Sequence, residues 1–166
     1  MEKLERIKIK IHSWESIRKQ VSIWRFKGKK IVFTNGCFDI LHRGHIEYLS
    51  RSRDLGGILI VGLNSDLSVK RIKGRHRPIN DEASRSLVLA SLAVVDAVIM
   101  FDQDTPYDLI RHIEPDILVK GKDYEPEGIA GYDIVVATGG EIVTIELTPG
   151  YSTTSIEEKI LHLHGK

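Results

Sequence analysis

The fold is decided at residues 30–45, which read KIVFTNGCFDILHRGH, an apolar run followed by a glycine turn and two histidines. The run from Lys30 to Thr34 does not alternate cleanly between apolar and polar residues. Such a run predicts a strand that is covered on both faces, as in a parallel sheet. After the histidines, the stretch from Ile46 to Leu55 has helical spacing and stops at Gly56-Gly57. The sequence here therefore predicts a strand, a tight turn and a helix.

Four more apolar runs rich in valine and isoleucine predict strands, at residues 58–63, 97–101, 116–120 and 141–145. Helices are expected at residues 14–26, 46–55, 81–93, 105–113 and 153–163, with a further helical or irregular stretch between the second and third strands. Strands that alternate with helices predict an α/β fold, here a single Rossmann-like three-layer domain around a five-stranded parallel sheet. We expect residues 1–28 to form an N-terminal helical extension that packs on the core of the domain at residues 29–166.

Composition narrows the classes of function. The chain has 166 residues, 42% hydrophobic and 28% charged, with 24 basic and 23 acidic residues. This near balance gives no sign of a nucleic-acid or membrane partner. Cys37 is the one cysteine, so no intrachain disulfide can form, and no apolar run approaches the ~18 residues of a spanning helix. The charged N-terminus does not resemble a signal peptide, so we expect a cytoplasmic protein.

The decapeptide Gly36–His45 follows the first strand, and in parallel sheets ligands bind beyond the carboxyl ends of the strands. Gly36 lets the backbone approach a ligand closely. His42 and His45 are three residues apart, so their imidazoles share one side of a first helical turn, and Gly44 leaves room for a bulky group. Together with the positive end of the helix, these features predict an anion site.

Plainer interpretations compete for the same residues. A single histidine near a helix start is usually structural or merely exposed, and two histidines could instead bind a metal. We expect no metal site in the chain, because no third ligand besides Asp39 lies nearby in the sequence. Cys37 is expected to be a small buried residue rather than a nucleophile.

The pattern G-x-F-D-x-x-H-x-G-H, which follows a strand and opens a helix, resembles the signature of the cytidylyltransferase-like nucleotidyltransferases. The resemblance implies that His42 and His45 embrace the nucleoside triphosphate and stabilise charge as the α-phosphate is attacked. It also implies that Cys37 and Phe38 line the nucleotide through their backbone, and that Asp39 organises the phosphate or metal side. Residues 29–166 are then the nucleotidyltransferase domain.

The same reaction makes chemical sense without the family. A phosphorylated acceptor has a second pKa of about 6, so it is mostly ionised near neutral pH and can attack without a general base. The enzyme must supply alignment and must stabilise growing negative charge, which cationic side chains and amides do. The lack of an obvious catalytic carboxylate or serine triad is therefore expected.

A basic stretch follows the second strand at residues 64–74. By itself such a stretch is usually a solvated face, but beside the histidine pair it is a good clamp for phosphates. Lys73 is the leading catalytic candidate, and Lys70 and Asp66 are candidates for the substrate phosphate. Arg85 lies in the next helix, where the family often has an arginine that contacts the nucleotide.

A Ser-Thr-Thr run at residues 152–154 opens the last helix, where such a run is often only an N-cap. It resembles the second signature of the family, I-S-T-T-x-I, which grips the triphosphate end. Tyr151 replaces the usual isoleucine and no arginine follows the run, although Lys159 is placed to substitute one turn later. The nucleotide-binding residues that we expect are Asn35, Gly36, Cys37, Phe38, Asp39, Gly44, Arg85, Lys120, Gly121, Ser152, Thr153 and Thr154.

Several segments narrow the resemblance to the adenylyltransferases that make ADP-heptose. They are residues 34–42, 64–66, 68–71, 77–80, 104–106, 115–121, Asp123-Tyr124, 139–141 and 152–154. The resemblance implies transfer of AMP from ATP to D-glycero-β-D-manno-heptose 1-phosphate, giving ADP-heptose and pyrophosphate, with Mg²⁺ carried mainly on the ATP phosphates. It also implies a homodimer and, because the sequence has no sugar-kinase half, a stand-alone form of the enzyme.

Other functions share parts of this pattern. Glycerol-3-phosphate cytidylyltransferase and FAD synthetase have the same decapeptide. A non-catalytic nucleotide-binding module on the same fold belongs to a second class, although binding alone does not need the histidine pair. Class I aminoacyl-tRNA synthetases also use a histidine–glycine–histidine motif, but this chain is too short for one and has no K-M-S-K-S loop.

Overall fold

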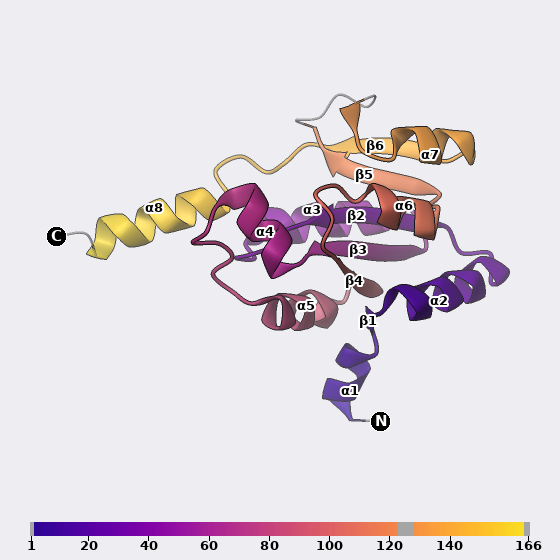
Figure 1. Cartoon of the computed structure of the whole chain (residues 1–166), viewed down its shortest axis with the longest axis horizontal. Coiled ribbons are helices and arrows are strands. Elements are labelled where there is room, and N and C mark those ends of the chain that lie inside the picture. Colours follow the sequence, from indigo (N-terminus) through magenta and orange to yellow (C-terminus); the bar gives the residue numbers. More distant parts are fainter. Residues whose placement is uncertain (1, 123–127, 165–166) are drawn as a thin grey trace.

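The computed structural model describes residues 2–122 and 128–164, and it has helices on both faces of one parallel sheet (Figure 1). The strands are β1 (Ile11–His12), β2 (Ile31–Gly36), β3 (Ile58–Asn64), β4 (Ala97–Phe101), β5 (Ile117–Gly121) and β6 (Glu141–Ile145). The helices are α1 (Lys3–Lys8), α2 (Trp14–Phe26), α3 (Arg43–Asp54), α4 (Asp66–Lys73), α5 (Glu82–Ser91), α6 (Tyr107–Ile113), α7 (Tyr132–Ala137) and α8 (Thr153–His164). Asp123 and Tyr124, which contribute to the resemblance given above, lie outside the described residues.

The sheet has the strand order β1-β4-β3-β2-β5-β6, and all its strand pairs are parallel. All five predicted strands are present, but the prediction of a five-stranded sheet was wrong because β1 adds a sixth strand at one edge. Ile11 and His12 of β1 pair with Val98 and Ile99 of β4. A strand of two residues is too short to show any periodicity in the sequence.

The helices differ from the expected ones mainly at their ends. α3 begins at Arg43 rather than Ile46, so that His45 lies in its first turn. α4 is the helical stretch expected between the second and third predicted strands, whereas α1 and α7 were not predicted. Among residues 2–122 and 128–164, no helix is long and apolar enough to cross a membrane.

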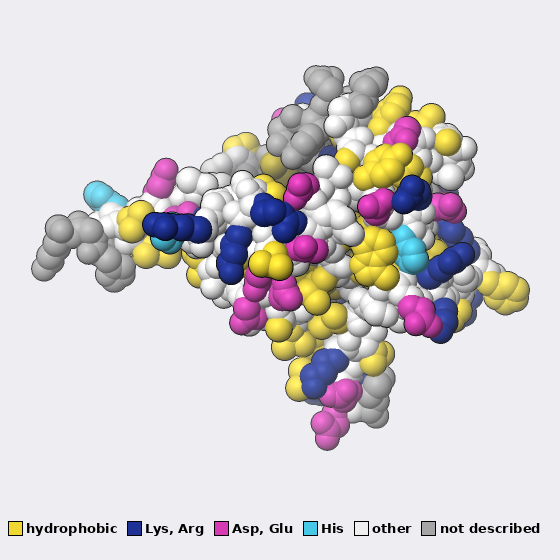
Figure 2. Space-filling model, in the orientation of Figure 1, with side chains coloured by type: hydrophobic (Ala, Val, Ile, Leu, Met, Phe, Trp, Pro, Cys, Tyr) yellow, Lys and Arg dark blue, Asp and Glu magenta, His cyan; other side chains and the backbone are white. Residues whose placement is uncertain are grey.

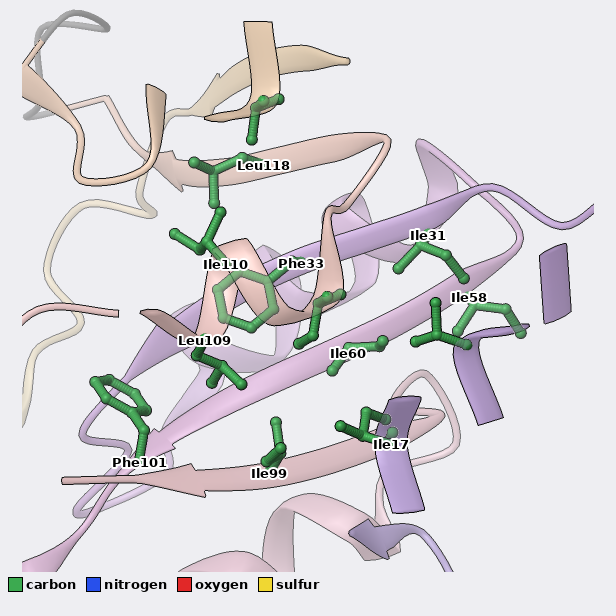
Figure 3. Packing of buried hydrophobic residues seen from close by; sticks show 14 of the residues in the cluster. Ile17, Ile31, Phe33, Ile58, Ile60, Ile99, Phe101, Leu109, Ile110 and Leu118 are labelled. Atoms are coloured by element: carbon green, nitrogen blue, oxygen red, sulfur yellow. The ribbon is translucent and has the colours of Figure 1, made fainter. Parts of the chain in front are cut away.

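Buried side chains fill both spaces between the sheet and its helices. On one face, Phe33 of β2 belongs to the same packed cluster as Ile17 of α2 and Leu109 of α6 (Figure 3). On the other face, Val32 packs in a second cluster with Leu49 of α3. The three layers confirm the predicted α/β architecture. The full burial of Ile17 confirms that the N-terminal helix packs on the core of its own chain.

The middle of the sheet provides the place for a ligand. The chain runs from β2 through β3 to β4 on one side, and then returns to place β5 against the other side of β2. At such a reversal the loops leave neighbouring strands in opposite directions, and a crevice opens at the carboxyl ends of the strands. The residues that follow β2, β3 and β5 therefore converge on one edge of the sheet.

Candidate active site

A cavity of about 720 Å³ opens at this edge, beside the start of α3 and the start of α8. Most of the predicted site residues line it, namely Asn35, Gly36, Cys37, Phe38, Asp39, His42, Gly44, His45, Lys73, Lys120, Gly121, Ser152, Thr153 and Thr154. Lys70, Asp66 and Arg85 lie outside its wall. The structure thus brings the decapeptide, one lysine of α4 and the Ser-Thr-Thr run around one space.

The two histidines form a stacked pair at the start of α3. His42 is the N-cap residue, with an extended backbone, and His45 follows in the first turn. Their ring centroids are 3.8 Å apart and the ring planes are inclined by 24°. Within the described residues, Nδ1 of each ring is buried and has no hydrogen-bond partner. Buried polar atoms without a partner are rare in proteins, and a catalytic role is one explanation for such atoms.

Both imidazoles are held in the neutral form. Burial lowers the pKa of His42 below its ordinary value. Burial, followed by the positive charges of His42 and Lys73, lowers the pKa of His45 to about 4. A neutral imidazole donates one N–H, so each ring offers one hydrogen bond to a phosphate oxygen near pH 7. Bound negative charge favours the protonated form and therefore raises both pKa values.

Two glycines and a strained phenylalanine shape the wall around the histidines. A Cβ atom on Gly44 would lie 3.2 Å from the ring of His42 and 3.3 Å from Cβ of Tyr151. Phe38 has a positive φ of 45°, and its ring lies 5.2 Å from the ring of His45. A Cβ atom on Gly36 would approach that same phenylalanine ring to 3.0 Å. The glycines are therefore required by close packing within the loop as well as by room for a ligand.

Asp39 holds the loop in place and points its carboxylate into the protein. Oδ2 accepts a hydrogen bond from Arg77 at 2.7 Å, and Oδ1 accepts from the amides of Ile79 and Asn80 at 2.8 and 3.0 Å. Burial alone would raise the pKa of Asp39, but the hydrogen bonds from Asn80, Arg77 and Ile79 outweigh burial and lower it. Sequence reasoning assigned no role to Arg77 and predicted Asn80 as the N-cap of the next helix, which was wrong because Asp81 is the N-cap of α5. The segment Arg77-Pro78-Ile79-Asn80 nevertheless stood out as part of the resemblance.

Arg85 lies directly behind the cavity rather than in it. Its residue is 2% exposed, and its guanidinium donates to the carbonyls of Cys37 at 2.6 Å and Asn64 at 2.9 Å. It also forms an ion pair of 2.8 Å with Asp66. These contacts join the ends of β2 and β3. The carboxylate of Asp66 is thereby directed towards Arg85, while Lys70 is exposed on α4.

Sequence reasoning missed several other residues of the wall. They come from helices, strand ends and loops far apart in the chain, namely Tyr48, Asn64, Ile72, Asp104, Thr105, Pro106, Gly128, Ile129, Ala130, Leu147, Thr148 and Tyr151. Asp104-Thr105-Pro106 follows β4, so its position after a strand was a usable signal. On the floor of the cavity, the ammonium group of Lys120 donates to the side-chain oxygen of Asn35.

Within residues 2–122 and 128–164, no group of three histidine, cysteine, aspartate or glutamate side chains is arranged to hold a metal ion. Asp39 was a candidate organiser of a metal. Both its carboxylate oxygens accept hydrogen bonds from residues 77–80. The arrangement can bind and stabilise negative charge through neutral imidazoles, an ammonium group and the N-terminus of α3.

Comparisons with known proteins agree with this geometry. A family model described as cytidylyltransferase-like matches residues 33–159. The chain is 54% identical over 151 residues to the bifunctional protein HldE of Wolinella succinogenes, which is 91% of this chain and 31% of that protein. It is 51% identical over 152 residues to the bifunctional protein HldE of Syntrophotalea carbinolica, again 31% of that protein. The chain therefore spans about a third of the length of these curated relatives.

Among solved structures, the chain is similar to the lipopolysaccharide core biosynthesis protein of Thermoplasma volcanium GSS1. The TM-score is 0.58 and the sequence identity is 31%. The match covers 73% of this chain and 98% of that chain. The likeness therefore extends over nearly the whole of that smaller protein.

Proposed function

Because the chain belongs to the cytidylyltransferase-like family of nucleotidyltransferases, we propose that it transfers AMP from ATP to D-glycero-β-D-manno-heptose 1-phosphate. An oxygen of the ionised sugar phosphate attacks the α-phosphorus of ATP in line with the bond to the β-phosphate. A new phosphorus–oxygen bond forms as that bond breaks, and pyrophosphate leaves with the electron pair. The products are ADP-heptose and pyrophosphate.

The observation that carries the proposal is the stacked pair of His42 and His45, with two buried Nδ1 atoms that lack a partner among the described residues. The pair shares the cavity with Lys73 and with the Ser-Thr-Thr run. In-line phosphoryl chemistry with an ionised acceptor asks for aligned donors and positive charge rather than a general base. These side chains supply that chemistry.

The residues have separate roles in this proposal. His42 and His45 donate hydrogen bonds to oxygens of the α-phosphate as the negative charge on those oxygens grows. Lys73, at the end of α4, offsets the negative charge of the triphosphate. Ser152, Thr153 and Thr154 present hydroxyls and helix amides to the β- and γ-phosphates. Asn35 to Asp39, Gly44, Lys120 and Gly121 surround the nucleotide. Arg85 acts from behind the wall through the carbonyl of Cys37.

The choice of acceptor rests on the segments that resemble ADP-heptose-forming adenylyltransferases and on the two relatives named HldE, which are about half identical over most of this chain. The structural neighbour is a lipopolysaccharide core biosynthesis protein, and a heptose nucleotide fits that process. Mg²⁺ enters in this proposal as the MgATP complex, and its charge offsets that of the leaving pyrophosphate. We place the reaction in the cytoplasm, where ATP is supplied.

We also infer a homodimer. α8 projects from the body of the protein, and apolar side chains lie along it (Figure 2). Ile160, Leu161 and Leu163 of this helix are exposed by 50%, 69% and 68%. A second copy of the chain would remove this apolar surface from water. Light scattering coupled to size exclusion tests the inference, and a monomer at micromolar concentration would contradict it.

A substrate panel tests the catalytic proposal. ATP or CTP is combined with heptose 1-phosphate, glycerol 3-phosphate or FMN, and pyrophosphate release is measured. Release with ATP and heptose 1-phosphate is expected. Turnover with CTP alone would reject the adenylyltransferase assignment, and turnover only with FMN would indicate an FAD synthetase. ATP binding without any pyrophosphate release would favour a non-catalytic binding module.

A further inference from the structure

We propose that Arg77 is a positioning residue. By bridging Glu157 and Asp39, it holds the start of α8, which faces the phosphates, in a fixed position relative to the loop between β2 and α3 that carries His42. The inference rests on the proposed function, because its catalytic consequence is a change in the use of ATP. Its structural part, the tie between α8 and the loop, stands on the contacts alone.

The bridge consists of one guanidinium between two carboxylates. Nη1 of Arg77 lies 2.7 Å from Oδ2 of Asp39, and Nη2 of Arg77 forms an ion pair with Glu157. The side chains are 15% exposed for Arg77, 1% for Asp39 and 28% for Glu157. Burial from solvent strengthens such pairs relative to pairs on an open surface.

The anchor of the bridge is rigid. The carboxylate of Asp39 also accepts hydrogen bonds from the backbone amides of Ile79 and Asn80. In turn, the side-chain amide of Asn80 donates a hydrogen bond to the backbone carbonyl of Asp39 at 2.7 Å. The loop that carries His42 is therefore fixed to residues 77–80 by four hydrogen bonds, counting that from Arg77. Because Glu157 pairs with Arg77, it is connected to this loop as well.

At the other end of the bridge, α8 depends on contacts near its start for its position. α8 points outward from the sheet, and its distal residues Ile160, Leu161 and Leu163 are exposed (Figure 1). Its direction in the monomer is thus determined near its start, where Ser152 to Thr154 line the cavity. Glu157 lies one turn beyond Thr153 on this helix. Fixing Glu157 fixes the hydroxyls and amides that face the triphosphate.

Several further contacts hold the segment that leads into α8, but they connect it to α3. The hydroxyl of Thr148 donates to Glu47, and the guanidinium of Arg43 lies 5.3 Å from the ring centroid of Tyr151. These contacts hold residues 146–151 against α3. The bridge through Arg77 is the contact that relates α8 itself to Asp39.

Arginine suits this role and lysine does not. The planar guanidinium has separate N–H groups that bond two carboxylates in fixed directions, whereas the ammonium of lysine is a single point charge on a flexible stem. Arg77→Lys therefore keeps the charge beside buried Asp39 but loses the connection to Glu157. This variant separates the loss of the bridge from the loss of charge at Asp39.

The decisive comparison is Glu157→Ala against Glu158→Ala. Both positions lie in α8, so the change in helix propensity is the same, and Glu158 is exposed. For Glu157→Ala we expect the KM for ATP to rise about five- to tenfold, the range for losing a partly buried bond to a charged group, with kcat within about twofold. We also expect faster hydrogen exchange at the amides of residues 154–157. Glu158→Ala should change neither quantity, and Arg77→Lys should resemble Glu157→Ala.

The outcomes separate this inference from the proposed function. Unchanged KM and unchanged exchange in Glu157→Ala would overturn the inference. Faster exchange with an unchanged KM would reduce Glu157 to a structural contact and overturn the positioning role. If the unaltered chain released no pyrophosphate with any acceptor, the proposed function would fail. The exchange comparison and calorimetric ATP binding would then still decide whether the bridge positions α8.

Discussion

The imidazole rings of His42 and His45 lie face to face with their centroids 3.8 Å apart. Burial lowers the pKa of both imidazoles, and for His45 the repulsion between positive charges at this separation adds to the effect, so the free protein holds the pair neutral. We expect a bound triphosphate to reverse this balance, because phosphate oxygens accept hydrogen bonds and attract positive charge. The pair is thus ready to gain positive character only when substrate is present.

Removal of either imidazole should lower turnover with little effect on folding. We expect His42→Ala and His45→Ala to reduce kcat by ~10² or more, the range for lost donors that stabilise transition-state charge. His162→Ala, at an exposed position on α8, is the control and should keep full turnover. Circular dichroism checks that the variants fold. Near-normal turnover in either variant would show that the assigned role is wrong for that histidine.

The protonation of His45 should depend on bound nucleotide. In the free protein its pKa is about 4, whereas the unfolded chain has the ordinary value near 6.5. Between these values the unfolded state binds the proton and the folded state does not, so stability falls as pH falls through this window. NMR titration of the imidazole should show the low pKa and a rise on addition of ATP. A free-state pKa near 6.5 would contradict the proposed burial of the pair.

Asp39 should stabilise the fold through Arg77. Asp39→Asn leaves Arg77 without its buried partner, and we expect the free energy of unfolding to fall by ~3–5 kcal/mol, as for broken buried ion pairs. Because hydrogen bonds lower the folded pKa of Asp39, its contribution is present above about pH 4 and is lost as pH falls through the folded pKa. Urea denaturation measures both effects. Exposed Asp54→Asn is the control, and equal loss in the two variants would count against the network.

The two lysines of α4 should differ. Lys73 lines the cavity, whereas Lys70 lies outside its wall. We expect Lys73→Ala to raise the KM for ATP about tenfold or more, because a hydrogen bond to a charged group contributes about 1.5–3 kcal/mol. Lys70→Ala should change the KM far less. Steady-state kinetics at several ATP concentrations decides this, and equal effects would mean that the phosphates extend beyond the described cavity.

Gly44 should tolerate no side chain in the active enzyme. In Gly44→Ala the new Cβ presses on His42 and on Tyr151, so the imidazole moves from its stacked position. A displacement approaching ~1 Å from aligned geometry costs up to ~10² in rate. Alanine favours helix over glycine, so the melting temperature should not fall in proportion to kcat. Ser50→Ala in the same helix serves as control, and full turnover in Gly44→Ala would show that the space is not needed.

The sequence predicted the elements whose signals are local. The five predicted strands and the helices α2, α3, α5, α6 and α8 follow from apolar runs and their flanking turns, because these patterns repeat over several residues. α7, which lies between β5 and β6, was not predicted. β1 was missed because two residues carry no such pattern. α3 was predicted to begin too late because its first residues, Arg43 to His45, are polar or glycine and show no apolar spacing.

In the candidate site too, the local features were predictable from the sequence and the contacts between distant segments were not. The sequence by itself determined the turn after β2, the spacing of His42 and His45, and the edge of the sheet where they lie. Only the tertiary structure decided that Asp39 binds residues 77–80 and that Arg85 supports the wall from behind. The sequence favoured Lys73 over Lys70, and the structure shows that only Lys73 of these two lines the cavity. The physical reason is the separation along the chain of the residues that interact. Spacing within a turn follows from covalent geometry, whereas the partner of a buried charge depends on which distant segments the core brings together.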